Sequence, residues 1–388
     1  MRPLLSIVVP TRNRQNCALS LVKGLHASEA RNFELVLHDN SDNDSLGAAV
    51  AELGDPRLRY SHTSDKLNMH GNFDRAIEQA KGVYLCGLGD DDGILVEPAL
   101  ALLQTALDRD IDAVLPGIHS YSWPDLRHWY WGDVGGRLFP SVTPAHERLL
   151  DPETELAAVF ACGVTRGVGR LPRVYQGIVS RRSLDAVKAR SGTYFPGPSP
   201  DMANAVALGA TVRSIWLHPE PVIISGHSPK SGGGAGAAGQ HHGRLEDQPH
   251  LPAGTVEAWT PAIPRFWSGF TIYAQSAQVA ASQSRSVPPP PLGLANLYAA
   301  CLVFERRAYW PEVWKAMRRH PRFGPGLILN VAGAATMLLA QRARGFVGNF
   351  LRYRFARGDP RRFTDIADLM QALRDERGAA GRPAPVTR

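Results

Sequence analysis

The sequence has little cysteine, with four residues in 388. They lie far apart and form no CxxC pair, a pattern that excludes a disulfide framework and gives no zinc-ligand spacing. We therefore expect reduced thiols and a cytoplasmic protein. The four residues are Cys17, Cys86, Cys162 and Cys301.

Long hydrophobic runs are also missing. The N-terminal apolar stretch LLSIVVP is too short for a signal peptide and no small-residue cleavage site follows it, so we interpret it as a first buried strand. The apolar stretch at 325–340 falls short of the roughly 20 residues that a membrane-spanning helix needs. An Arg-, Phe- and Tyr-rich stretch follows it. The two together predict either an interfacial helix on anionic lipid or a core helix with a basic outer face.

Positive charge is concentrated near the C-terminus. Between Glu305 and Arg362 there are 13 Lys and Arg against three Asp and Glu, whereas the whole chain carries a net +7. This asymmetry favours an anionic membrane surface as partner, although a solvated basic face gives the same pattern. No nucleic-acid-binding motif accompanies the arginines, so we expect no nucleic acid partner. We expect a cytoplasmic protein, peripheral on the inner face of the cell membrane.

Apolar strands and helices alternate regularly in the first 120 residues. The strands lack polar alternation, which is typical of a mostly parallel sheet with helices on both faces and hence of an α/β fold. The predicted strands are 4–10, 33–39, 58–63, 83–89 and 112–118, with helices near 15–28, 45–53, 72–82 and 96–110. A helix at 199–210 and a strand at 211–224 follow, and further helices are predicted at 294–304, 309–320, 325–356 and 363–377.

Polar clusters follow three of these strands: PTRNR at 10–14, DNSDND at 39–44 and GDDDG at 89–93. The carboxyl ends of parallel strands share one edge of a sheet, where ligands bind. Each pair of adjacent carboxylates costs about 3 kcal/mol at 5 Å and an effective dielectric of 20. A divalent cation that carries a diphosphate would offset this repulsion. The pattern predicts a metal and nucleotide site on the rim of the sheet, although Asp39 alone is also an ordinary turn residue.

The segments SIVVPTRNR, LVLHDNSDND and KLNMHGNFDRAIEQAKGVYLCGLGDDDGIL resemble the opening of family 2 glycosyltransferases with the GT-A fold, of the type that builds bacterial surface polysaccharides. The resemblance implies that Pro10, Thr11 and Asn13 hold the nucleotide and that Asp39 contacts its base. It implies that the DxD motif contacts ribose and binds Mn²⁺ or Mg²⁺ through the diphosphate. This chain has three consecutive acids instead, so Asp90 is the first ligand and either Asp91 or Asp92 is the second; we select Asp92.

The resemblance also implies a domain division. Residues 1–228 would form the GT-A catalytic domain, with the nucleotide-sugar half at 1–118 and the acceptor half at 119–228. Residues 229–260 would be a flexible Gly- and His-rich loop or linker, and residues 261–388 a helical, basic C-terminal region. In the loop that begins at GHSPKSGG, His227 is a candidate third metal ligand, and the loop itself is either a lid or an ordinary linker.

Family 2 enzymes invert the anomeric centre, so a carboxylate must take the proton of the acceptor hydroxyl. Asp201 in SPDM lies where the family carries this base, although Ser-Pro-Asp is also a favourable helix start. Lys66 and Asn68 lie near the expected diphosphate, or form a surface turn and helix cap. The Trp- and Tyr-rich stretch at 121–131 either packs in the core or stacks on acceptor sugars.

The sequence therefore predicts a metal-dependent inverting glycosyltransferase. It would move a sugar from a nucleoside diphosphate donor to a glycan or lipid-linked acceptor in surface polysaccharide biosynthesis. One alternative is a catalytically silent GT-A-like protein that binds nucleotide-sugars or serves in assembly. A nucleotidyltransferase is disfavoured, because that class opens with a Gly-rich loop and PTRNR contains no glycine.

Overall fold

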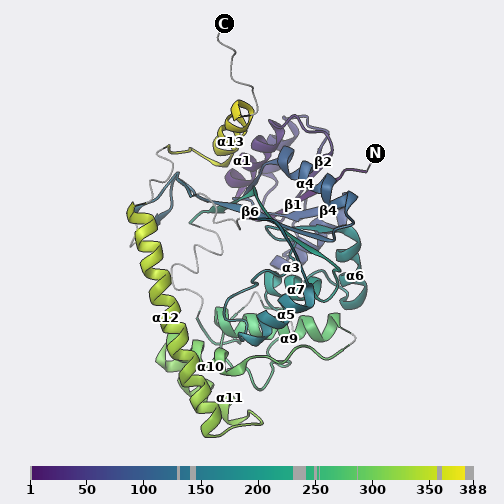
Figure 1. Ribbon diagram of the computed structural model, residues 1–388. Helices are drawn as coiled ribbons and strands as arrows, with labels where there is room; N and C mark the ends of the chain where they lie inside the picture. The colour runs from purple at the N-terminus through teal and green to yellow at the C-terminus, as the bar shows by residue number, and fades with distance from the viewer. Residues whose placement is uncertain are drawn as a thin grey trace.

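The computed structural model describes residues 2–128, 132–139, 146–229, 242–248, 251–252, 254–285, 287–355 and 361–380 (Figure 1). The strands are β1 (Leu5–Thr11), β2 (Phe33–Asp39), β3 (Leu58–His62), β4 (Tyr84–Gly87), β5 (Gly93–Ile94), β6 (Ala113–Ser122), β7 (Arg127–His128), β8 (Gly132–Asp133), β9 (Leu138–Phe139), β10 (Arg148–Leu150), β11 (Ile178–Ser180) and β12 (Ile215–His227). The helices are α1 (Gln15–His26), α2 (Ser45–Ala51), α3 (Met69–Gln79), α4 (Val96–Asp108), α5 (Pro152–Ala161), α6 (Arg181–Ser191), α7 (Pro200–Gly209), α9 (Gly269–Ser284), α10 (Leu294–Phe304), the 3₁₀ helix η1 (Arg307–Tyr309), α11 (Trp310–Arg318), α12 (Pro325–Phe355) and α13 (Ile366–Ala380).

The central sheet has the strand order β10-β12-β6-β11-β4-β1-β2-β3. β1 is parallel to β2 and β4, β2 to β3, and β12 to β6. β11 is antiparallel to both of its neighbours, β4 and β6. The predicted α/β fold with helices on both faces is confirmed, and its sheet is mixed. The sequence pattern missed short strands such as the three-residue β11 and also the helices α5, α6 and α9.

Helices cover both faces of the sheet, because successive side chains of a buried strand point to opposite sides. Leu5, Ile7 and Val9 of β1 belong to one buried cluster together with residues of α1, α2, α4 and α13. Val8 belongs to a second cluster together with residues of α3, α6 and α7. The continuous apolar runs in the sequence reflect this burial on two sides.

A second helical body packs below the sheet in Figure 1. Residues from α9 to α12 share one buried cluster, which includes Leu297, Val313 and Val331. A smaller cluster joins α5, α7 and α9, so the helical body is continuous with the sheet domain. The predicted helical character of the C-terminal region is confirmed for the described residues.

Helix α13 returns to the sheet domain and lies beside α1 (Figure 1). Ile366 and Met370 are fully buried in the cluster that contains β1. A Cβ on Gly24 of α1 would lie 2.8 Å from the sulfur of Met370, so the two helices are in close contact. Arg374 donates to the carbonyl oxygen of Gly24 at 2.9 Å.

Helix α12 stands at the side of the molecule (Figure 1). Among the described residues, Pro325–Gly345 is the one helical stretch long and apolar enough to cross a membrane by length and composition. Only 17% of its apolar window is buried. The interpretation of 325–340 as a core helix is therefore wrong, because most of its apolar surface faces outward.

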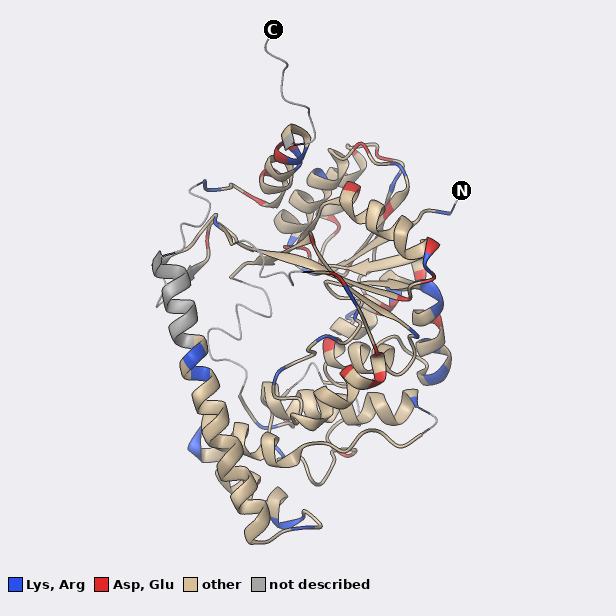
Figure 2. Ribbon diagram, viewed as in Figure 1, with Lys and Arg blue, Asp and Glu red and all other residues tan. Residues whose placement is uncertain are grey.

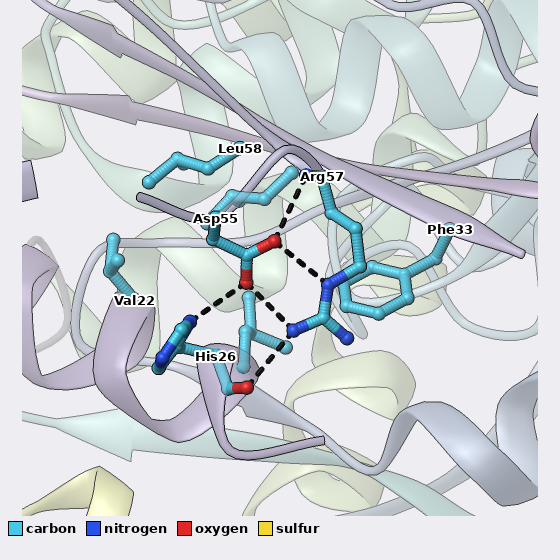
Figure 3. A pocket seen from close by; sticks show the side chains of 8 residues that line it. Val22, His26, Phe33, Asp55, Arg57 and Leu58 are labelled. Atoms are coloured by element: carbon cyan, nitrogen blue, oxygen red, sulfur yellow. Dashed lines mark hydrogen bonds and ion pairs between the residues drawn. The ribbon is translucent and has the colours of Figure 1, made fainter. Parts of the chain in front are cut away.

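A charged cluster lies at the edge of the sheet where β2 and β3 begin (Figure 3). Arg57 donates to both carboxylate oxygens of Asp55, at 2.9 and 2.7 Å, and to the carbonyl oxygens of three residues near the end of α1. Those carbonyls belong to His26, Ser28 and Ala30. The hydrogen bonds from Arg57 hold the pKa of Asp55 well below its usual range. This cluster fixes the connection between α1, β2 and β3 at the edge opposite to the carboxyl ends of the strands.

Replacing Arg57 by Ala should lower the free energy of unfolding by about 2–4 kcal/mol, because the mostly buried carboxylate of Asp55 loses both guanidinium hydrogen bonds and keeps the weaker contact with His26. Urea denaturation measures the change. Arg31→Ala is the matched control, since Arg31 is exposed in the same region. If both variants lowered the free energy of unfolding equally, the Arg57–Asp55 cluster would contribute no more to stability than an exposed arginine does.

Candidate functional site

The three predicted polar clusters lie at one edge of the sheet. In the register of β1 and β2, Thr11 is opposite Asp39. β4 flanks β1 on its other side, with Gly87 opposite Val8, so the turn after β4 emerges beside the loop after β1. The prediction that these clusters meet is confirmed for the described residues.

We call Gly89–Asp92 the acidic turn. Its carboxylates lie at the rim of the sheet, where the site was predicted, but all three are buried. Asp90 and Asp91 are each 3% exposed and Asp92 is 0% exposed. The turn is covered by side chains and backbone from other segments, which the strand pattern could not indicate.

One arginine joins the first two acids. Arg14, directly before α1, places Nη1 2.8 Å from Oδ1 of Asp90 and Nη2 2.8 Å from Oδ2 of Asp91. Thr11 donates its hydroxyl to Oδ2 of Asp90 at 2.6 Å. Ser228 donates its hydroxyl to Oδ2 of Asp91 at 2.7 Å. Two carboxylates thus converge on a single cation.

Asp92 has a different environment. Its oxygens accept hydrogen bonds from the backbone N–H groups of Gly89 and Gly226, both at 2.8 Å, and from the side-chain amide of Gln176 at 3.1 Å to each oxygen. Burial raises the pKa of Tyr175, whose hydroxyl is near enough for the charge of Asp92 to raise it further. Asp92 therefore binds the turn to two other segments of the chain, and its oxygens are already hydrogen-bonded.

Burial changes the ionisation of the turn. It raises the pKa of Asp90 to about 7 in spite of the nearby Arg14. Burial and the charge of Asp91 also raise the pKa of Asp92. The three acids coexist because burial disfavours full ionisation and because Arg14 supplies one compensating charge.

The loops after β1 and β2 are joined to each other. Asn13, whose φ is +55°, donates its amide to Asp42 at 3.0 Å and accepts the backbone N–H of Asp42 at 3.1 Å. Asp39 is fully buried; it accepts the backbone N–H of Ser41 at 2.8 Å and the hydroxyl of Tyr60 at 3.1 Å. Asp39 therefore shapes the turn after β2, as an aspartate at such a position commonly does.

The remaining predicted donor residues are spread along this edge. Pro10 is half-buried within β1, and Lys66 is exposed. Asn68 caps α3 by accepting the backbone N–H of Gly71 at 2.8 Å, so the helix-cap interpretation is confirmed. Asn72, in the next turn of α3, donates to the carbonyl oxygen of Thr11 at 3.1 Å and positions the loop after β1.

Asp201 lies in the first turn of α7, half-buried, as the Ser-Pro-Asp sequence predicts. Burial raises its pKa, and the charge of Arg173 opposes that rise. The pKa of Tyr175 is raised by burial and by the charges of Asp92 and Asp201. Tyr175 is therefore near both the acidic turn and Asp201.

His227 is the last residue of β12 and its ring contacts the hydroxyl of Ser120 at 3.0 Å. Burial lowers its pKa, and Asp91 is near enough to oppose the shift. The predicted flexible segment that begins at residue 226 is wrong for residues 226–227, because β12 continues through them. Residues 230–241, where the predicted lid would lie, fall outside the described residues.

The predicted metal ligands Asp90, Asp92 and His227 do not form one set. No group of three His, Cys, Asp or Glu side chains placed to hold a metal occurs among the described residues. Asp90 and Asp91 nevertheless suit a cation, because Oδ1 of Asp90 is buried and accepts no hydrogen bond, and its contact is the ion pair with Arg14. Two carboxylates are enough for a magnesium-like ion that also binds substrate phosphates.

The sequence did not reveal the residues that surround the acidic turn. Arg14 was visible in PTRNR, but its ion pairs with two acids 76 and 77 residues away were not. Gln176 has φ +53°, and strained backbone of this kind gathers at functional sites. The stretch at 165–177 showed only an Arg- and Gly-rich composition. Ser228 lay in a segment interpreted as a loop.

The comparisons with known proteins agree with this geometry. Residues 6–166 match the sequence profile of glycosyl transferase family 2. The N-terminal region of the chain is similar to this family. The matched region contains β1, β2, β4 and the acidic turn, whereas Gln176, Asp201 and Gly226 lie beyond the match.

Two curated bacterial relatives are similar to part of this chain. WcaA of Escherichia coli K12, named as a colanic acid biosynthesis glycosyl transferase, is 34% identical over 92 residues, which are 23% of this chain and 33% of WcaA. The GalNAc(5)-diNAcBac-PP-undecaprenol beta-1,3-glucosyltransferase of Campylobacter jejuni is 30% identical over 107 residues, 27% of this chain and 35% of that protein. The chain spans about a third of the length of these relatives.

A solved structure shares the fold over most of the chain. The structure of residues 1–349 of S. aureus TarS in complex with UDP-GlcNAc has a TM-score of 0.50 and 13% sequence identity. The match covers 81% of this chain and 79% of that one. The predicted GT-A fold is confirmed.

Gly226→Ala should distort the acidic turn, because a Cβ at this position would lie 1.7 Å from the carbonyl oxygen of Asp91. We expect the free energy of unfolding to fall by about 2–3 kcal/mol. Thermal denaturation measures the change. Gly333→Ala in α12, where a Cβ meets nothing within 4 Å, is the control and should stabilise by up to about 1 kcal/mol. A neutral Gly226→Ala would contradict the close packing of β12 against the turn.

Proposed function

We propose that this protein is a glycosyltransferase that moves a sugar from a nucleoside diphosphate donor to a glycan or lipid-linked acceptor in surface polysaccharide biosynthesis, with inversion at the anomeric carbon. The observation that carries the proposal is the convergence of Asp90 and Asp91 on one cation at the carboxyl ends of β1 and β4, with Asp201 near Tyr175. The match of residues 6–166 to glycosyl transferase family 2 and the names of the relatives support the same class of reaction.

In the proposed complex the donor nucleotide lies on the edge formed by the loops after β1 and β2. Pro10, Thr11 and Asn13 border it from the first loop and Asp39 lies beneath it in the second. Lys66 is exposed close to the start of α3 and is available to an anionic diphosphate. The complex of TarS, which shares the fold, is with UDP-GlcNAc, and this supports a nucleoside diphosphate sugar as the donor here.

We propose Asp90 and Asp91 as the carboxylates that would hold Mn²⁺ or Mg²⁺. When bound, the ion would neutralise the negative charge of the diphosphate leaving group. Asp92 serves this pair by fixing the turn, since its oxygens accept hydrogen bonds from Gly89, Gly226 and Gln176. Asp91 is thus proposed as the second metal ligand in place of Asp92. His227 lies near Asp91.

Asp201 is the proposed general base. Burial raises its pKa, which brings a carboxylate closer to the basicity that proton transfer near neutral pH requires. The cationic Arg173 nearby favours the ionised form that accepts the proton. The acceptor hydroxyl would lose its proton to Asp201 while its oxygen attacks the anomeric carbon.

A thermal-shift screen with UDP, GDP, dTDP and CDP, each with Mn²⁺ and with EDTA, tests the donor half. Binding at a hundredfold excess over Kd stabilises by about 2.7 kcal/mol. A shift with one nucleotide that disappears in EDTA supports the proposal and identifies the nucleotide. No shift with any nucleotide would contradict it.

Asp91→Asn and Asp92→Asn should have different effects. Asp91→Asn should weaken Mn²⁺-dependent binding of the nucleotide identified above at least about tenfold, because a ligand carboxylate is lost. Asp92→Asn should instead lower the stability of the ligand-free protein by about 1–3 kcal/mol, because it places an amide group against buried N–H donors. Calorimetric titration and thermal denaturation separate the two effects.

Asp65→Asn is the control for this pair, since Asp65 is an exposed acid at the same edge. Loss of metal-dependent binding in Asp92→Asn with an unchanged melting temperature would return the ligand role to Asp92.

Asp201→Asn should leave the affinity for the donor nucleotide unchanged and reduce transfer by about 10²–10⁴-fold, the usual contribution of a general base. The measurement is release of nucleoside diphosphate from the matching nucleotide-sugar in the presence of a membrane lipid extract. Asp185→Asn, on the exposed surface of α6, is the control. If turnover in Asp201→Asn were unchanged, the general base would have to be another residue.

A further inference from the structure

The surface formed by α11, the following turn and α12 has an unusual composition. Of the 11 large apolar side chains that are exposed among the described residues, seven lie between positions 310 and 339. They are Trp310, Trp314, Phe323, Ile328, Leu329, Met337 and Leu339, with exposed fractions from 41% to 72%. We call these seven residues the apolar face.

The apolar face is not the ordinary outer side of an amphipathic helix. Leu327, Val331 and Ala334 are buried on the inner side of α12, where the helix packs on α10. The outward side carries no charge either, because no Asp, Glu, Lys or Arg occurs at 323–341. Figure 2 shows α12 without charged residues along most of its described length. A helix apolar on both sides requires an apolar environment on its second side as well.

Cations surround the apolar face. Residues 306–344 contain eight Lys and Arg and a single acid, Glu312, for a net +7, which equals the net charge of the whole chain. Two arginines lie directly against exposed tryptophan rings: Arg307 is 5.5 Å from the ring centroid of Trp310, and Arg318 is 5.5 Å from that of Trp314. Tryptophan and arginine both combine an apolar body with a polar end, and both are suited to a boundary between water and hydrocarbon.

We propose that the apolar face docks on a bilayer that contains anionic lipid. The apolar side chains would enter the hydrocarbon boundary, while the surrounding Lys and Arg meet the headgroups. α12 would lie along the membrane plane, because its inner side stays packed on α10. A second copy of this chain is disfavoured as the occupant, because two such faces would bring like charges together.

The docked helix is continuous with the candidate site. After α12 the chain reaches Phe363, whose N–H bonds the carbonyl oxygen of Gly136 at 2.8 Å and whose carbonyl accepts the hydroxyl of Tyr121 at 3.1 Å. Tyr121 belongs to β6, and Trp123, just past the end of β6, donates to the carbonyl oxygen of Asp91 at 2.9 Å. The far end of α12 therefore connects to the segment that covers the acidic turn.

Vesicle flotation of the full chain tests the proposal. The wild type should bind phosphatidylcholine vesicles that contain phosphatidylglycerol, bind pure phosphatidylcholine much less, and lose part of its binding in high salt. The double variant Leu329→Glu, Met337→Glu should reduce the partition coefficient at least about tenfold, because two side chains that enter the hydrocarbon boundary become charged. Thermal denaturation should show that this variant folds, since both positions are exposed.

The control is Leu107→Glu with Leu149→Glu, which adds the same charge at two exposed leucines of the sheet domain and should bind as the wild type does. Absence of wild-type binding, equal binding to neutral vesicles, or an equal loss in the control would each overturn the proposal. The proposal would also be overturned if light scattering showed that the wild type is a dimer and that the Leu329→Glu, Met337→Glu variant dissociates it while the control variant does not. Nucleotide binding, measured in the same samples, does not depend on docking, so failure of one proposal is distinguishable from failure of the other.

Discussion

The buried carboxylate of Asp92 joins three segments that are distant in the sequence. Gly89 belongs to the turn after β4, Gln176 precedes β11, and Gly226 lies near the end of β12. Burying a carboxylate is costly unless donors surround it, and here four hydrogen bonds from backbone and amide groups do so. The positions of Asp90 and Asp91 depend on this arrangement, because they extend from the same turn.

The site is therefore built around two kinds of acid. Asp92 is surrounded by neutral hydrogen-bond donors and holds segments of the fold together. Asp90 and Asp91 instead face the cationic side chain of Arg14 and the loop after β1. The guanidinium of Arg14 lies between two acids, and in the proposed function a metal with its diphosphate would use the same position. Strained residues on both sides, Asn13 and Gln176, indicate that the surrounding fold holds these loops in position.

Much of the fold could be predicted because it follows from local pattern. Apolar runs and helix periodicity located β1, β2, β4 and α12 to within a few residues, and parallel pairing explained why Thr11, Asp39 and Asp90 meet. Burial of the acidic turn could not be predicted, since it depends on Gln176 and Gly226 in segments without a distinctive pattern. The contact of α13 with α1 was equally hidden, because periodicity gives a helix its apolar face but not the partner of that face.

The return of α13 has a consequence for the synthesis of the chain. The cluster around β1 contains Leu5 near one end of the sequence and Ile366, Met370 and Leu373 near the other. A ribosome that has completed the acidic turn and β12 has still to deliver more than a hundred residues before this core can close. Gly24 and Gly93 lack side chains where α13 packs, since a Cβ on the first would lie 2.8 Å and a Cβ on the second 3.1 Å from the sulfur of Met370. The core of the sheet domain therefore closes only after α13 has been synthesised, and contacts of such large sequence separation slow folding.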